Sequence, residues 1–185
     1  MKISNRTLGH KKSGFTMIEL MLVIVIGVGL GALAIPRFMD TKNMNDAREE
    51  ASKLSEFKSA IDSMYQRTID YSTLDGIYQQ IAPSSFENDG TIVRNIWKNV
   101  VTVEGAEGSY EITHQAVPDG RVCQEFIRGT QSQGWVKIDV DGASVGDGHP
   151  ADADPAQIIG VCGGGTTASG STVDITFTFD VSGSA

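Results

Sequence analysis

The sequence predicts an α+β protein in which one long N-terminal helix packs on an antiparallel β-sheet, and three observations indicate this class. The first is an apolar run from Phe15 to Ile35 that carries a single charge, Glu19. The second is an amphipathic helical pattern that follows Pro36, and the third is a set of β-rich segments beyond residue 99. The chain has 185 residues, which is enough for one such helix and one globular domain of ordinary size.

Residues 1–14 are polar and basic, and we expect them to be a leader rather than folded structure. They hold four basic residues and no acidic one, whereas the rest of the chain holds 11 basic and 23 acidic residues and a net charge of −12. Proteins bind the phosphate backbone of nucleic acids through Lys and Arg. We therefore expect no direct binding of nucleic acid by this acidic domain.

The apolar run is long enough to span a membrane, because about 20 residues at 1.5 Å each reach across a bilayer core of about 30 Å. An ordinary secretory signal has a shorter apolar core and a small-residue cleavage site, for which residues 31–34 are a weak match. A simple membrane anchor would explain the length and the lysines before it. It would not explain Glu19, since a carboxylate in the middle of a membrane helix costs about 2.5–3.5 kcal/mol.

Three glycines and a proline interrupt the apolar helix: Gly27, Gly29, Gly31 and Pro36. Each glycine costs about 1 kcal/mol relative to alanine in a helix, and a proline about 3 kcal/mol. One interpretation is that this section bends or melts when the protein assembles. The other is that the small residues let helices pack closely in a membrane.

Apolar residues at spacings of three and four continue the helix beyond the proline, with polar residues between them. They are Met44, Ala47, Ala51, Leu54, Phe57, Ile61, Met64 and Thr68. We expect this stripe to pack on the protein's own globular domain, with a coiled coil as the alternative. The helix is expected to end between Thr68 and Gly76.

The remaining elements follow from local pattern. Residues 72–81 suggest a short helix halted by Pro83, and residues 84–96 are expected to form a loop. Residues 99–103 and 109–113 are β-rich and separated by glycines, so they predict a hairpin.

Further along the chain, residues 122–127 suggest a short helix and residues 135–140 a third strand. Residues 141–155 are expected to form an exposed loop; they are rich in acids but do not fit a calcium-binding template, so we expect no metal site. The final strand is the clearest, with an apolar residue at every second position of residues 173–181. We expect that strand to pack on the long helix.

Two cysteines, Cys123 and Cys162, lie well beyond the apolar run. An exported domain with an even number of cysteines favours a disulfide, and two cysteines allow one pairing. The three histidines are scattered, and none belongs to a catalytic triad or dyad that the sequence suggests. We therefore expect no enzyme activity and no cofactor.

The junction at Lys11-Lys12-Ser13-Gly14-Phe15, with Glu19 in the helix after it, resembles the processing signature of type IV prepilins. The resemblance implies that a membrane prepilin peptidase cleaves between Gly14 and Phe15 and methylates the new amine of Phe15. It also implies that Glu19 pairs with that amine during assembly. Residues 95–103, 109–113 and Cys123 look similar to type IVb pilins, including those of conjugative thin pili, although the short leader and Phe15 lean towards the IVa convention.

This resemblance implies a precursor with three parts: a cleaved leader at 1–14, a transmembrane and filament-core helix at 15–42, and a globular head at 43–185 that includes the second half of the helix. A major pilin would wait in the inner membrane of a Gram-negative bacterium. An assembly platform would then polymerise it with other copies into an extracellular pilus for adhesion, aggregation, motility or mating. The alternatives are a pseudopilin of a type II secretion system and a membrane-anchored surface binding protein that does not polymerise.

Overall fold

The computed structural model describes residues 16–146, 150–163 and 171–181, without the side chains of residues 31–38 and 40. The chain divides into two compact units, Met1–Asp40 and Thr41–Ala185. Helix α1 (Met17–Met64) contributes its first part to one unit and its second part to the other. The second unit is called the head below.

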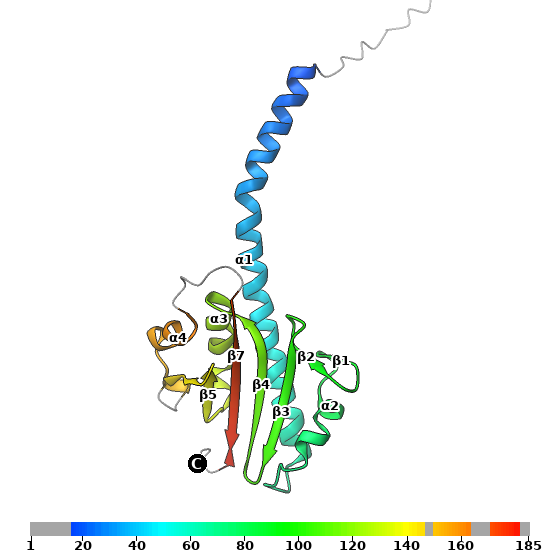
Figure 1. Cartoon of the computed structure of the whole chain (residues 1–185), viewed down its shortest axis with the longest axis vertical. Helices are drawn as coiled ribbons and strands as arrows, with labels where there is room; N and C mark the ends of the chain where they lie inside the picture. Colours follow the sequence, from blue (N-terminus) through cyan, green and yellow to red (C-terminus); the bar gives the residue numbers. More distant parts are fainter. Residues whose placement is uncertain (1–15, 147–149, 164–170, 182–185) are drawn as a thin grey trace, which may run out of the picture. The chain divides into compact units, whose positions relative to one another are not determined.

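The described strands of the head form one seven-stranded sheet in the order β1-β2-β3-β4-β7-β5-β6 (Figure 1). Each neighbouring pair is antiparallel. The expected hairpin is confirmed as β3 (Val100–Ala106) and β4 (Ser109–Pro118). Gly108 completes the tight turn between them with a φ of 83°, a backbone conformation that favours glycine.

The last strand in the chain, β7 (Thr172–Asp180), lies inside the sheet between β4 and β5 (Lys137–Val140). Strand β5 confirms the third strand expected at 135–140 and pairs in turn with the short β6 (Ala143–Ser144). Successive side chains of a strand point to opposite faces of the sheet, so Ile175 and Phe177 of β7 are buried in the core while their neighbours lie on the more open face.

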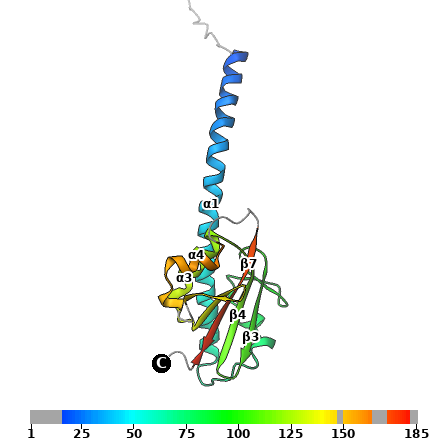
Figure 2. The same ribbon diagram turned by 60° about the vertical axis from the view of Figure 1, so that its left-hand side comes forward.

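The head part of α1 lies across one face of the sheet, as the views in Figures 1 and 2 agree. Buried side chains of the helix and of β7 belong to the same apolar cluster, among them Phe57 and Phe177. The Nζ atom of Lys58 lies 4.5 Å from the centre of the Phe179 ring. The expectation that the final strand packs on the long helix is therefore confirmed.

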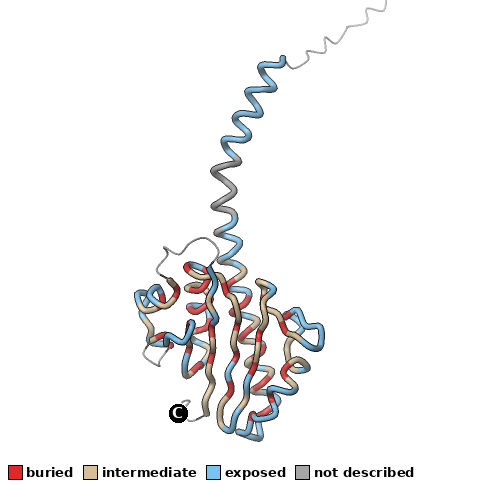
Figure 3. The backbone as a smooth tube through the Cα atoms, in the orientation of Figure 1, coloured by how far each residue is buried: buried red, intermediate tan, exposed pale blue. Residues whose placement is uncertain are grey.

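The apolar stripe predicted for α1 is buried over its middle and open at its ends. Figure 3 shows the buried positions recurring along the head part of the helix, and they include Ala47, Ala51, Leu54, Phe57 and Ile61. Met44 is half-buried, Met64 is exposed and Thr68 lies beyond the helix. The stripe packs on the protein's own globular domain, as expected, and not in a coiled coil within the described chain.

Helix α1 ends at Met64, earlier than the range of 68–76 that the pattern predicted. The chain leaves the helix because it pairs with the turn between β3 and β4. The N–H of Tyr71 donates to the carbonyl of Ala106 at 3.1 Å, and that of Gly108 donates to Ile69 at 2.7 Å. The short helix expected at 72–81 is also divided, into η1 (Leu74–Gly76) and α2 (Tyr78–Ile81).

The prediction of a loop over 84–96 is wrong in part, because two short strands extend the sheet there. They are β1 (Glu87–Asn88) and β2 (Val93–Arg94). The Oδ1 atom of Asp89 accepts hydrogen bonds from the N–H groups of Thr91 and Ile92, both at 2.8 Å. This Asp-centred turn reverses the chain and brings the two strands together.

Helix α3 (Arg121–Thr130) confirms the helix expected at 122–127 and continues into η2 (Gln131–Gln133). It lies very close to α1 where Gly129 meets Ala51. A Cβ atom added to Gly129 would stand 2.8 Å from the Cβ of Ala51, closer than two such atoms normally approach. Glycine at this position therefore sets the distance between the two helices.

Residues 141–155 are not simply an exposed loop. Besides β6 they contain η4 (Pro150–Asp152) and the start of α4 (Pro155–Val161), and Val145 is fully buried. Asp154 caps α4, since its Oδ1 accepts from the N–H of Gln157 at 2.8 Å while the Gln157 side chain accepts from the Asp154 N–H at 3.0 Å. This box and the proline after the cap are a readable start signal that our sequence interpretation missed.

The predicted disulfide is confirmed. Cys123 in α3 is joined to Cys162 at the end of α4, and both residues are fully buried. The N–H of Gly120 also donates to the carbonyl of Cys162 at 2.9 Å. The bond therefore ties the end of α4 to the beginning of α3. It closes a loop between two cysteines that are 39 positions apart in the sequence.

Candidate functional site

The first turn of α1 places the carboxylate of Glu19 against Thr16, the residue before the helix. The N–H of Glu19 donates to the Thr16 hydroxyl at 3.3 Å, and the N–H of Thr16 donates to Glu19 Oε2 at 3.5 Å. This reciprocal pair is a capping box, which satisfies donors that a helix start leaves unpaired. Glu19 thus has a local role that the sequence interpretation did not assign to it.

An unusually large apolar surface follows Glu19 along the helix. All its large hydrophobic side chains are more than half exposed, namely Met17, Ile18, Leu20, Met21, Leu22, Val23, Ile24, Val25, Ile26, Val28 and Leu30. Exposed apolar surface of this extent marks a site of interaction with protein or membrane. Nothing within the described part of the chain covers it.

The membrane span predicted for residues 15–35 is not confirmed. Among the residues that the structure describes, no helix has both the length and the apolar character that crossing a bilayer requires. Phe15 lies outside the described residues, and so do the side chains of residues 31–35.

The predicted processing residues, Gly14 and Phe15, also lie outside the described residues. Helix α1 runs without a break past Gly27 and Gly29 and on through residues 31–36. A Cβ atom added to Gly27 or Gly29 would meet nothing within 4 Å. The predicted flexibility of this section stays a prediction, as does the charge pairing of Glu19.

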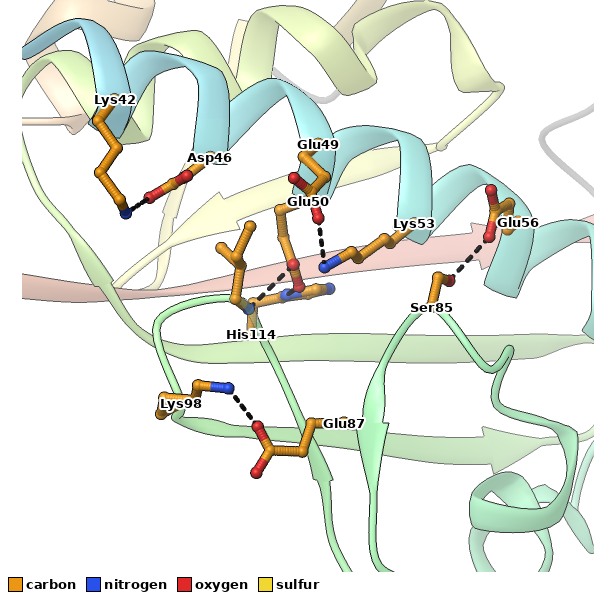
Figure 4. Close-up of polar contacts among 11 residues, drawn as sticks. Lys42, Asp46, Glu49, Glu50, Lys53, Glu56, Ser85, Glu87, Lys98 and His114 are labelled. Atoms are coloured by element: carbon orange, nitrogen blue, oxygen red, sulfur yellow. Dashed lines mark hydrogen bonds and ion pairs between the residues drawn. The ribbon is translucent and has the colours of Figure 1, made fainter.

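The head contains a buried ionisable pair that the sequence did not reveal. Glu50 on α1 and His114 on β4 are both fully buried, and Figure 4 shows the two side chains meeting between helix and sheet. Glu50 Oε1 lies 3.1 Å from His114 Nδ1, although no hydrogen bond of acceptable angle joins these two atoms. The two side chains are therefore in contact without a hydrogen bond between these atoms.

The second carboxylate oxygen of Glu50 holds the loop before β3. Its Oε2 accepts a hydrogen bond from the N–H of Ile96 at 3.0 Å. The loop is braced further by the buried Asn95, whose Nδ2 donates to the carbonyl of Gln115 at 2.9 Å and whose Oδ1 accepts from the N–H of Asn99 at 2.9 Å. Glu50 is thus the polar link between α1 and the loop that leads into β3.

Three aromatic rings enclose the imidazole of His114. The ring centres of Phe126, Phe177 and Phe86 lie 5.1, 5.9 and 6.3 Å from it. His114 Nε2 has no hydrogen-bond partner among the described residues. No sequence spacing signals this pair, because Glu50 occupies the apolar face of a helix and His114 an ordinary inward position of a strand.

A second polar contact crosses from α1 to β4 near the other end of the sheet. The hydroxyl of Tyr110 donates to Asp62 Oδ1 at 3.1 Å, and Asp62 also pairs with Lys58 at 2.7 Å. Burial raises the pKa of the Tyr110 hydroxyl well above its ordinary value, and the charge of Asp62 raises it further. The pKa of the neighbouring Tyr71 is raised by the same two causes.

Two described acidic residues of the 139–154 region, Asp139 and Asp141, make polar contacts within the protein. Asp139 accepts from Ser144 at 2.6 Å and pairs with Lys137, while Asp141 Oδ1 accepts from the N–H of Asp174 at 2.8 Å. Within the described ranges, no three His, Cys, Asp or Glu side chains come together in a way that could hold a metal ion.

Comparison with known proteins connects both parts of the chain to one class. Residues 42–179 match the family described as PilS N terminal, and residues 9–34 match the prokaryotic N-terminal methylation motif. The crystal structure of a type IVb pilin from Salmonella typhi is similar in fold, with a TM-score of 0.54. That alignment covers 71% of this chain and 97% of the pilin at 16% sequence identity.

Two relatives by sequence are named as components of type II secretion systems. The type II secretion system core protein G of Escherichia coli (strain K12) is 29% identical over 128 residues, which are 62% of this chain and 88% of that protein. The protein of the same name from Pectobacterium carotovorum subsp. carotovorum is 38% identical over 58 residues, 31% of this chain and 36% of that protein.

Proposed function

The chain belongs to the PilS N-terminal family and is a type IV pilin-like precursor, and from this premise we propose that it is a structural subunit of a type IV pilus. The observation that carries the proposal is the exposed apolar surface between Met17 and Leu30, which has no cover in the described part of the chain. Copies of this helix packed side by side in a filament core would bury that surface. At about 25 cal/mol per Å² of apolar surface left in water, this helix needs either lipid or other copies of itself around it.

Processing would precede assembly. A prepilin peptidase would cleave between Gly14 and Phe15, and the methylated amine of Phe15 would remain positively charged. The capping box supports a later pairing of Glu19 with this amine, because it holds Glu19 in the first turn of α1, near the residue that becomes the N-terminus. In an apolar filament core a carboxylate needs a partner, and the amine of the same or a neighbouring subunit would supply it.

Before assembly the apolar helix would be stored in the inner membrane, and an assembly platform would move the subunit into the filament. Transfer from lipid to a core of identical helices can be close to balanced, since both surroundings are apolar. The head, with its disulfide, would face the extracellular medium and present the surface used in adhesion, aggregation, motility or mating.

A pseudopilin of a type II secretion system is the second candidate, and the likeness to core protein G favours it. A pseudopilin would share the processing and the helical core, but it would act inside the cell envelope during secretion. The head fold of the type IVb pilin and the family match over 42–179 favour the pilus.

Electron microscopy of cells with and without this chain tests the proposal. A pilus subunit is expected to give surface filaments that disappear on deletion and return on complementation. The intact mass of the subunit in sheared filaments should correspond to a chain that begins at methylated Phe15. Unchanged filaments with a loss of protein secretion would favour the pseudopilin, and a mature chain that begins at Met1 would contradict both.

A further inference from the structure

Two oppositely charged surfaces of the head lie near opposite ends of β4, and we infer that the cationic one binds the acidic one of the next copy in the assembly. The cationic cleft comprises Arg121 and Arg128 with Met44, Gln124 and Glu125. The acidic hairpin comprises Glu104, Glu107 and Glu111 of the β3–β4 hairpin. This inference rests on the proposed polymerisation and names the contact that would join the heads.

The cationic cleft has a volume of about 180 Å³ and lies where α3 approaches α1. Arg121 and Arg128 are two helical turns apart, so they share one face of α3 with Gln124 and Glu125 between them. Glu125 does not neutralise them, because its Oε1 lies 2.7 Å from Arg48 Nε. Neither Arg121 nor Arg128 forms an ion pair within the described residues, and both are exposed.

The position of Arg121 is unfavourable within its own molecule. It is the first residue of α3, whose first turn holds no acid. The positive end of the helix dipole disfavours a cation there. In a domain with a strong excess of acids, an unpaired arginine at this place indicates a partner outside the chain.

The acidic hairpin has the complementary feature. Glu104 and Glu111 are direct cross-strand partners of β3 and β4, and both are exposed. Like charges directly opposite each other destabilise a strand pair. Neither makes an ion pair in the described structure; Glu111 Oε1 accepts only a hydroxyl hydrogen bond, from Thr178 at 3.0 Å.

Both glutamates line a cleft of about 210 Å³, together with Gly105, Ala106, Ser109 and Tyr110. A guanidinium group placed in it could donate hydrogen bonds to both carboxylates, because it carries several N–H donors in a planar fork. An arginine from another molecule would thereby relieve the repulsion between Glu104 and Glu111.

The two surfaces cannot meet within one molecule. Arg121 follows the end of β4 by three residues, and Glu111 lies near its beginning. The seven residue-to-residue steps from Glu111 to Pro118 span about 23 Å of extended strand, and Figure 1 places α3 and the β3–β4 turn towards different ends of the sheet. A contact between unlike surfaces of identical copies is heterologous, and such contacts generate rings or open helical filaments.

Charge reversal in full-length chains tests the contact in cells that make no other copy. Arg121→Glu with Arg128→Glu, or Glu104→Lys with Glu111→Lys, is expected to lower the yield of sheared filaments at least tenfold. Combining all four substitutions should restore most of the yield, because every copy then carries both reversed surfaces. Arg67→Glu with Arg94→Glu changes the net charge as much as the first pair and should leave the yield within about twofold.

A cysteine pair gives a second readout that does not depend on visible filaments. Chains with both Arg128→Cys and Glu104→Cys should form disulfide-linked ladders on non-reducing gels. Chains with Thr91→Cys and Glu104→Cys should not, because Thr91 lies on the turn between β1 and β2.

The outcomes separate this inference from the proposed function. Filaments without a ladder, or a fourfold variant that stays as defective as the double variants, would overturn the inference alone. A ladder without filaments would support the contact and overturn the pilus, and the absence of both would overturn both. If the arginines instead bound an anionic lipid surface, only their reversal would matter and the acidic reversal would be silent, which also contradicts the inference.

Discussion

The two parts of α1 use the same secondary structure for opposite purposes. From Met17 to Leu30 the helix is apolar on all sides and exposed, whereas from Ala47 to Ile61 it has one apolar stripe that is buried under the sheet. Each part has one notable glutamate. Glu19 is exposed and caps its own helix, while Glu50 is fully buried and binds groups more than 40 residues away.

The width of the apolar surface of a helix therefore indicates whether its partner lies in the same chain or outside it. A narrow stripe finds its cover within the same chain, but a helix that is apolar on every side exceeds what one sheet can cover. The first part of α1 should therefore determine assembly and leave the stability of the head unaffected, and the second part should do the reverse. Substitutions in each part test whether assembly and head stability are separate.

The largest effect is expected from Glu19→Val. Without the carboxylate the charge of Phe15 would have no partner in the filament core, so sheared filaments should fall at least tenfold while the leader is still cleaved. Filament yield and intact mass measure the two quantities in cells that lack the wild-type copy. Glu19→Asp, which retains the charge, should lose less, and abundant normal filaments from the valine variant would disprove the pairing.

Glu50→Ala should destabilise the head by about 3 kcal/mol. It removes the acceptor of the Ile96 N–H and leaves His114 buried without the nearby carboxylate. Urea unfolding of the purified chain measures the change. Glu49→Ala is the matched control, since Glu49 is exposed and only pairs with Lys53 at 2.9 Å, so its loss should cost about 0.5 kcal/mol or less.

Glycine-to-alanine substitutions at two positions of the head should change its free energy of unfolding in opposite directions. Gly129→Ala is expected to lower the free energy of unfolding by about 1–2 kcal/mol. The new methyl group would collide with Ala51, and the cost of that overlap exceeds the gain in helix propensity. Gly160→Ala in α4 meets nothing within 4 Å and should instead stabilise the head by up to about 1 kcal/mol. Gly27→Ala, in the first part of α1, should leave head stability unchanged; an effect there comparable to Gly129→Ala would show that the two parts are coupled.

The smallest effect concerns alkaline pH. The pKa of Tyr110 is raised in the folded state by burial and by Asp62, so a tyrosine that ionises in the unfolded chain near pH 10 stays protonated in the fold. The stability that this group contributes is present below about pH 10 and is lost as the pH rises above it, by up to 1.4 kcal/mol per pH unit. Tyr110→Phe should lower stability by about 1 kcal/mol at neutral pH and flatten the alkaline slope measured by unfolding at pH 9–11. An unchanged slope would contradict the assignment.

The sequence alone determined the elements whose signals are local. Periodicity of three and four over 44–68 predicted the apolar stripe of α1, which is buried from Ala47 to Ile61, and alternation over 173–181 predicted the final strand. The two cysteines allowed one pairing, and the structure contains it. These predictions succeeded because the faces of a helix or strand depend on residues close in sequence, and because two cysteines allow one pairing.

Only the tertiary structure decided which distant residues meet. It placed β7 between β4 and β5, ended α1 at Met64 by pairing the next residues with the β3–β4 turn, and joined Glu50 to His114 across 64 positions. The Asp154 cap of α4 was readable but overlooked, whereas these contacts carried no local signal. These contacts have no local signal because the packing of the whole core selects which strands pair and which buried polar groups meet. The free energy that stabilises them is therefore spread over several segments.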